Sequence, residues 1–348
     1  MKVSIGIGGA SSGQRRDFDE QVEYVVEAEK LGIDAVWTAE AWGQDAIAPL
    51  AYLAARTGRI RLGTGIMQIS ARVPAMTALT MAAISNDRFI LGLGTSGPQV
   101  VEGLQGQPFK APLTRLKETV EIIKLALAGE KIEYHGKHHE LPLPGGQGKV
   151  LRLSQPANSN IPIYLATLKP QALEYTGAVA DGWLGTSFTP EHAAAHLEYL
   201  RRGAEGAGRS LADIEIEVGG TVAFGDDLDA LVEPLKPAMA FTLGAMGSAT
   251  TNFYNDAFKR GGWEAAGREV QRLWVAGKRP EAIAKVPSEM VVQANLLGNI
   301  EMVRERIRAY KNVGVTRLRV APVGRDLREK LTTLGKVMDL VHAINAGA

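Results

Sequence analysis

Cysteine is absent from this chain of 348 residues, which excludes disulfide bonds, thiolate metal sites and a cysteine nucleophile. An excess of charge is also lacking, because 39 lysines and arginines balance 38 acidic residues. No electrostatic argument therefore supports binding to nucleic acid or to an anionic membrane. No apolar run approaches the roughly 18–20 residues of a membrane span, and residues 1–9 are too short and glycine-rich for a secretory signal. We expect a cytoplasmic protein whose partner is a small molecule, with neither nucleic acid nor membrane.

What the chain does contain is a repeated alternation of apolar segments and helical patterns. The apolar segments are continuous rather than alternating in polarity, which is typical of parallel strands buried on both faces. We expect strands at residues 3–7, 33–40, 59–67, 88–94, 161–167, 181–186, 214–224 and 316–322. Helices are expected near residues 18–31, 46–57, 74–85, 113–128, 169–181, 190–205 and 299–313 and at the C-terminus.

Eight strand–helix units predict an α/β fold, a (β/α)8 TIM barrel forming one domain over residues 1–348. A doubly wound sheet is the alternative, although no linker divides the chain. Two insertions interrupt the alternation. Residues 131–160 follow the fourth helix and include a hairpin candidate, EYHGKHHEL. Residues 227–295 follow the seventh strand and are expected to be long, irregular and partly helical, covering the mouth of the barrel.

The fourth strand ends in Gly92-Leu-Gly94-Thr-Ser-Gly97, which matches the dinucleotide pattern G-x-G-x-x-G. A dinucleotide site requires these glycines to open a helix and an acidic residue about 20 positions later, at the end of the next strand. Here residues 98–112 are expected to form a loop, and no acidic residue lies between Glu102 and Glu118. The glycines are therefore expected to end a barrel strand at its C-terminal mouth, where loops build the active site.

Four runs resemble the luciferase-like oxidoreductases, and within them the branch that uses coenzyme F420, an 8-hydroxy-5-deazaflavin. They are VWTAEAWGQDA, RIRLGTGIMQISARVPAMTA, RFILGLGTSGPQVVEGLQGQPF and NFYNDAFKRGG. The resemblance covers essentially the whole chain. It implies hydride transfer between the deazaflavin C5 and a small organic substrate, and a homodimer.

The resemblance also implies where the cofactor binds. A non-proline cis peptide at Gly65–Ile66 would bulge against the cofactor ring. The loop after the fifth strand, where Pro170 suits a first helical turn and free N–H groups can bind an anion, would hold the cofactor phosphate together with the end of the sixth strand. The implied cofactor-binding residues are Gly65, Ile66, Met67, Gly94, Thr95, Ser96, Gly97, Ala166, Thr167, Leu168, Lys169, Gly185 and Thr186.

Glu40 and Trp42 are the candidate catalytic residues. In the family, the end of the second strand carries a histidine or an acid near the reacting ring carbon, and Glu40 occupies that place. A carboxyl group there suits general acid or base chemistry, so E40Q would be expected to lower turnover and spare cofactor affinity. The sequence departs from the sugar-phosphate dehydrogenases of the family, which have Asp-His at Ala39-Glu40 and a glutamate at Gly97. It also has no lysine in Ser187-Phe-Thr189.

The histidines do not form a convincing metal site. His192 and His196 are four residues apart, but no glutamate lies between them and no third ligand is evident. His135, His138 and His139 lie in the hairpin candidate, and no metal is expected there either. Two functional alternatives stay open. One is a two-component monooxygenase that binds FMN, and the other is a protein that binds the cofactor without chemistry.

Overall fold

The computed structural model describes residues 1–8, 14–247 and 251–347. The chain divides into two compact units, and each is described by itself. Unit 1 comprises Met1–Gly6, Ser12–Val36 and Thr167–Ala348, and unit 2 comprises Ile7–Ser11 and Trp37–Ala166. That residues 1–348 behave as a single domain stays a prediction. In the part of the chain that the structure describes, no helix is both long and apolar enough to cross a membrane.

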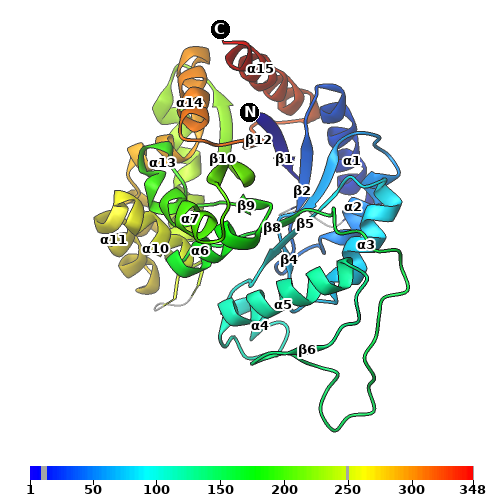
Figure 1. The fold of residues 1–348 in the computed structure, drawn as a ribbon. Helices are drawn as coiled ribbons and strands as arrows, with labels where there is room; N and C mark the ends of the chain where they lie inside the picture. The colour runs from blue at the N-terminus through cyan, green and yellow to red at the C-terminus, as the bar shows by residue number, and fades with distance from the viewer. Residues whose placement is uncertain (9–13, 248–250, 348) are drawn as a thin grey trace. The chain divides into compact units, whose positions relative to one another are not determined.

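The strands of unit 1 all pair in parallel (Figure 1). The order is β11-β10-β12-β1, and the first residues of β10 also pair with β9. Val218, Leu318 and Ile5 are fully buried in these strands, as expected for continuous apolar segments covered on both faces. The bounds are β1 Lys2–Gly6, β9 Gly182–Leu184, β10 Glu215–Phe224, β11 Leu296–Gly298 and β12 Arg317–Pro322.

The helices of unit 1 follow the expected alternation. In α1, the buried residues Val22, Val25 and Ala28 recur at helical spacing. Helices α6 and α7 make many contacts with each other, because glycines on both helices let their backbones approach. The bounds are α1 Arg15–Lys30, α6 Pro170–Val179, α7 Ala194–Gly206, α14 Ile300–Asn312 and α15 Leu327–Ala346, with short turns η1 Pro190–His192 and η2 Leu211–Asp213.

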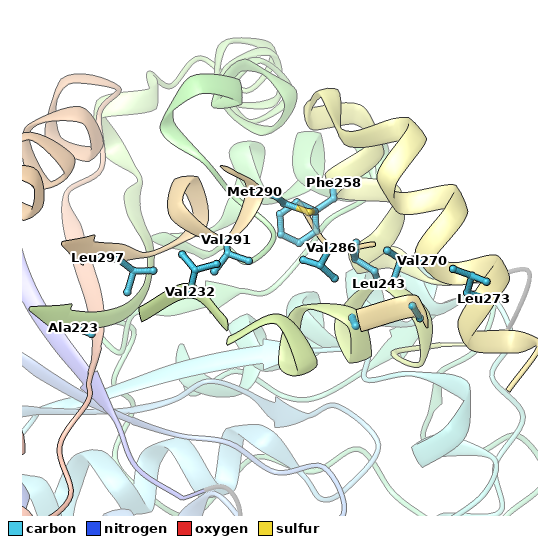
Figure 2. Close-up of a cluster of buried hydrophobic side chains, with 12 residues drawn as sticks. Ala223, Val232, Leu243, Phe258, Val270, Leu273, Val286, Met290, Val291 and Leu297 are labelled. Carbon is cyan, nitrogen blue, oxygen red and sulfur yellow. The ribbon is translucent and has the colours of Figure 1, made fainter. Parts of the chain in front are cut away.

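The segment 227–295 is mainly helical in its described residues rather than irregular. Its helices supply most of an apolar cluster, in which Phe258 and Met290 lie together with Val286 and Val291 (Figure 2). Ala223 of β10 and Leu297 of β11 belong to the same cluster. Except for Glu264–Val275, which has 12 residues, these helices have nine residues or fewer, so their hydrophobic periodicity is too brief to distinguish from loop in the sequence. The bounds are α8 Leu228–Val232, η3 Glu233–Leu235, α9 Lys236–Gly244, α10 Phe253–Phe258, the π-helical turn η4 Lys259–Trp263, α11 Glu264–Val275, α12 Arg279–Ala284 and α13 Ser288–Ala294.

Unit 2 contains the parallel strands β3, β5 and β8, in that order, and β4 pairs with the end of β5. Strand β2 begins in unit 1 and ends in unit 2. The bounds are β2 Ala35–Thr38, β3 Arg61–Thr64, β4 Met67–Gln68, β5 Phe89–Gly94 and β8 Ile163–Leu165, with helices α2 Ile47–Ala54, α3 Pro74–Ser85, α4 Pro98–Val101 and α5 Pro112–Leu127. The eight predicted strands are therefore all present.

One expectation for unit 2 is wrong in part. Residues 98–112 are expected to form a loop, and residues 102–111 do so, but the one-turn helix α4 begins at Pro98, with Gly97 as its N-cap. Proline has no N–H to lose at the first helical position and its φ angle is already helical, so it favours this start. The helix ends after a single turn.

The hairpin expected within residues 131–160 is confirmed. β6 (Tyr134–His135) and β7 (Glu140–Leu141) pair in antiparallel fashion. The buried carboxylate of Glu118 on α5 holds the connecting turn, because it accepts hydrogen bonds from the backbone N–H groups of residues 137–139 and contacts the His139 ring. Burial raises the pKa of Glu118, but these hydrogen bonds outweigh it and the net pKa lies below its ordinary value.

Candidate functional site

In unit 2, the chain leaves β3 through the peptide bond between Gly65 and Ile66, which is cis. The cis bond implied by the family resemblance is therefore confirmed. The segment is held against the end of β2 by two backbone hydrogen bonds. Gly65 N–H donates to the Thr38 carbonyl at 2.6 Å, and Glu40 N–H donates to the Ile66 carbonyl at 3.2 Å. Met67 then begins β4 and is fully buried.

The end of β5 passes very close to Ile66. A Cβ atom on Gly94 would lie 2.5 Å from Cδ1 of Ile66, so this position requires glycine as long as Ile66 stays in place. Beyond Gly94, residues 95–97 are half-buried, and Ser96 has a left-handed backbone with φ of 57°. The two predicted groups Gly65–Met67 and Gly94–Gly97 therefore lie together at neighbouring strand ends.

Glu40 is buried just beyond β2, and both oxygens of its carboxylate are engaged. Oε1 accepts hydrogen bonds from the backbone N–H of Gln68 at 2.9 Å and from Arg72 Nη1 at 3.2 Å. Oε2 accepts from Arg72 Nη2 at 2.9 Å and from the backbone N–H of Ala46 at 3.2 Å. Sequence reasoning gave Arg72 no role, although this residue lies within the run RIRLGTGIMQISARVPAMTA that carries part of the family resemblance.

Trp42, the second candidate catalytic residue, lies in the loop after β2 and is 64% exposed. Most of its surface is therefore accessible to solvent in the described structure. A catalytic role for Trp42 stays a prediction.

In unit 1, residues 167–169 lead directly into α6. Lys169 is the N-cap residue and Pro170 occupies the first helical turn, while no side chain caps the N-terminal N–H groups. The Thr167 carbonyl accepts a hydrogen bond from Nε1 of Trp183 in β9 at 2.9 Å, which attaches the loop to that strand. An uncapped helix N-terminus beside an exposed lysine is suited to an anion.

Two residues from the helical insertion contact this loop. Nζ of Lys169 lies 4.7 Å from the centre of the Phe253 ring, and Arg260 Nη2 donates to the Leu168 carbonyl at 2.5 Å. Sequence reasoning gave neither residue a role. Both belong to the run NFYNDAFKRGG that carries part of the family resemblance, so a signal was present without an assignment.

Gly185 directly follows β9, and the neighbouring side chains leave no space for a larger residue at this position. A Cβ atom there would lie 2.5 Å from both the Trp183 ring and Val218, so the position admits only glycine. Arg319 Nη2 donates to the Gly185 carbonyl at 3.3 Å. Thr186, which comes next, is half-buried. Ala166, the remaining cofactor-binding candidate, belongs to unit 2, where its N–H donates to the Leu93 carbonyl at 2.9 Å.

The two histidines of the predicted helix differ in environment. The His192 ring contacts Thr189 and lies edge-on to Trp263. His196 is 1% exposed among the rings of Trp183 and Phe188, and burial lowers its pKa to about 3. Among the described residues, no group of three or more histidine, aspartate or glutamate side chains is placed to hold a metal ion.

The family model for luciferase-like monooxygenases matches residues 1–317 of the chain. The chain belongs to this family. A relative from Mycobacterium tuberculosis, named “Putative coenzyme F420-dependent oxidoreductase”, is 40% identical to this luciferase-like protein over 329 residues, which cover 91% of this chain and 93% of the relative. Homologues of the family named in this way are enzymes, and so is this luciferase-like protein.

Two solved structures show the fold. The coenzyme F420-dependent tetrahydromethanopterin reductase from Methanopyrus kandleri is similar with a TM-score of 0.74 and 24% identity, covering 96% of this chain and 98% of that one. The oxygenating constituent of 3,6-diketocamphane monooxygenase from Pseudomonas putida, in complex with FMN, has a TM-score of 0.66 and 17% identity, covering 98% of each chain. This luciferase-like protein therefore has the (β/α)8 barrel fold, and the doubly wound alternative is wrong.

Proposed function

We propose that this luciferase-like protein is a coenzyme F420-dependent oxidoreductase that acts on a small organic substrate. The observation that carries the proposal is the 40% identity to a relative named for coenzyme F420, over nine-tenths of both chains. F420, when bound, supplies or accepts a hydride at C5 of its deazaflavin ring. The chain's own residues then have to bind that ring and the phosphate attached to it.

The strand ends of unit 2 fit a planar ring. The Gly65–Ile66 segment and residues 95–97 are half-buried at neighbouring strand ends, and residues 95–97 have small side chains or none. We propose that Gly65, Ile66, Met67 and residues 94–97 contact the ring. Ala166 follows β8 at the strand end next to that of β5 and is assigned to the same set.

The start of α6 in unit 1 fits a phosphate. It combines an uncapped N-terminus of a ten-residue helix with the exposed ammonium group of Lys169. We propose that residues 167–169 bind the cofactor phosphate and that Gly185 and Thr186, after β9, contribute to the same function.

The K169M variant should bind F420 about tenfold more weakly than the wild type, because one charge-assisted contact to the phosphate is lost. Titration at low and high salt would measure the effect, which should shrink as salt screens the charge. K149M, which removes an exposed lysine from the hairpin insertion, is the matched control and should bind like the wild type. Equal affinities for both variants would remove Lys169 from the site.

The choice between F420 and FMN is tested by titrating the purified protein with each cofactor at equal concentrations and following the fluorescence. Tight binding of F420 alone is expected, followed by hydride transfer when ketones, alcohols and enones are screened. A preference for FMN would move the protein to the monooxygenase alternative and make O2 the next reactant to test. Binding of F420 without turnover of any screened substrate would favour a carrier protein.

Two further expectations rest on the same reasoning. The family resemblance implies a homodimer, which sedimentation equilibrium would test by giving twice the chain mass. Cytoplasmic location also stays a proposal, tested by fractionating the cells that produce the protein.

A further inference from the structure

We propose that Arg72 is a positioning residue, and that Glu40 works with it to hold the cofactor-facing backbone of residues 66–68 rather than to transfer a proton. The inference rests on the proposed function, because it assigns that backbone to cofactor binding. It differs from the sequence-based expectation for Glu40, in which E40Q lowers turnover and spares cofactor affinity.

The pairing of Arg72 with Glu40 is two-pronged. Each terminal nitrogen of the guanidinium group bonds one carboxylate oxygen, Nη1 to Oε1 at 3.2 Å and Nη2 to Oε2 at 2.9 Å. The Glu40 side chain is only 8% exposed and that of Arg72 is 29% exposed, so water screens the pair much less than it screens surface pairs. Bidentate geometry fixes the orientation of both groups as well as their distance.

The remaining partners of the carboxylate are also hydrogen-bond donors. Backbone N–H groups of Gln68 and Ala46 complete a set of four donors on two oxygens. A proton on either oxygen would face one of these donors, and the contact there would be lost. The four donors therefore fix the position of the carboxylate and leave neither oxygen free to exchange a proton with a ligand.

What the pair holds in place is the segment after the Gly65–Ile66 peptide. The backbone N–H of Glu40 donates a hydrogen bond to the Ile66 carbonyl, and the Glu40 carboxylate accepts one from the Gln68 N–H. Glu40 therefore binds both ends of the segment 66–68. The Gln68 side chain donates back to the Glu40 carbonyl at 3.0 Å. It also accepts a hydrogen bond from Gln105, which in turn accepts from Ser70 at 2.6 Å.

This network spans residues far apart in the sequence. It connects the end of β2, the β4 segment and the loop that follows α4. Loss of Arg72 would leave a buried carboxylate held only by two backbone N–H groups, so the segment 66–68 would open more often. We therefore expect the consequence to show in cofactor affinity and in local opening.

The first test uses the cofactor-free protein. Amide hydrogen exchange at Gln68 and Ala46 is compared in the wild type, R72M, E40Q and the double variant. Both amides should exchange roughly tenfold faster in each single variant, and the double variant should be no faster, because the two side chains act as one unit. R152M, which removes an exposed arginine from unit 2, is the matched control and should match the wild type.

The second test measures F420 affinity, kcat at saturating F420 and the pH profile. Dissociation constants should rise roughly tenfold in R72M and E40Q alike, without adding in the double variant, and the shape of the pH profile should not change. R72K should recover part of the affinity, since it restores the charge without the two-pronged geometry.

Two results would overturn the proposal. In the first, E40Q loses turnover and a limb of its pH profile while exchange and affinity stay unchanged, which would make Glu40 a proton-transfer residue. In the second, R72M exchanges and binds like R152M. Failure of the wild type to bind F420 would instead count against the proposed function, and the exchange experiment would still decide the role of the pair.

Discussion

The G203A variant should be destabilised by about 3 kcal/mol or more, although alanine is normally the better helix residue. Gly203 lies in α7 where this helix touches α6, and a Cβ atom would fall 1.8 Å from the carbonyl oxygen of Glu174. A Cβ atom added to Gly177 on α6 would likewise lie 2.0 Å from the carbonyl oxygen of Leu200. Backbone atoms cannot rotate aside as a flexible side chain could, so the helices would have to separate.

Thermal denaturation of G203A and of G206A would check this result. Gly206 is in the same helix, but nothing lies within 4 Å of its added Cβ, so G206A should be neutral or slightly stabilising. A loss of 3 kcal/mol corresponds to roughly 4 °C for a chain of this length if unfolding is one transition. Because α6 begins at Pro170, we also expect G203A to weaken F420 binding. Equal stability of the two variants would show that the helices adjust at no cost.

The strands of this protein are predictable from its sequence because they are buried on both faces. Residues 89–94, for example, have no polar side chain, and all eight predicted strands are present in the structure. What the sequence did not reveal are elements too short to show a period. β4 has two residues, β11 has three and α4 has four. Such elements are held by their neighbours, as when β11 pairs with the end of β10.

The candidate site also contains residues that the sequence located and residues that it did not. Family resemblance located the cis peptide at Gly65–Ile66, because a glycine-rich strand end forms a recognisable run. It did not locate Arg72 or Arg260. Arg72 contacts a residue 32 positions away and Arg260 one that is 92 positions away. Both arginines lie within runs that carry the family resemblance, but a single arginine gives no periodic signal. Its distant partner is known only once the chain is folded.

His196 should make the protein less stable in acid. Its side chain is 1% exposed, and neither ring nitrogen has a hydrogen-bond partner in the described part of the chain. Burial, with a smaller contribution from the positive charge of Arg260, lowers its pKa from 6.5 to about 3. Between these values the unfolded chain binds a proton that the folded chain does not, so stability is lost as pH falls below 6.5. The loss should reach about 2 kcal/mol at pH 5.

The H196L variant should lack this dependence, because leucine fills a similar volume among Trp183 and Phe188 without a titratable ring. Urea denaturation at pH 7 and pH 5 measures the difference for each protein. We expect the stability that the wild type loses between these pH values to exceed that lost by H196L by about 2 kcal/mol. H342Q, which removes an exposed histidine from α15, should behave like the wild type. If H196L loses as much stability as the wild type, the acid sensitivity comes from another group and the His196 ring is protonated in the folded protein without a large cost.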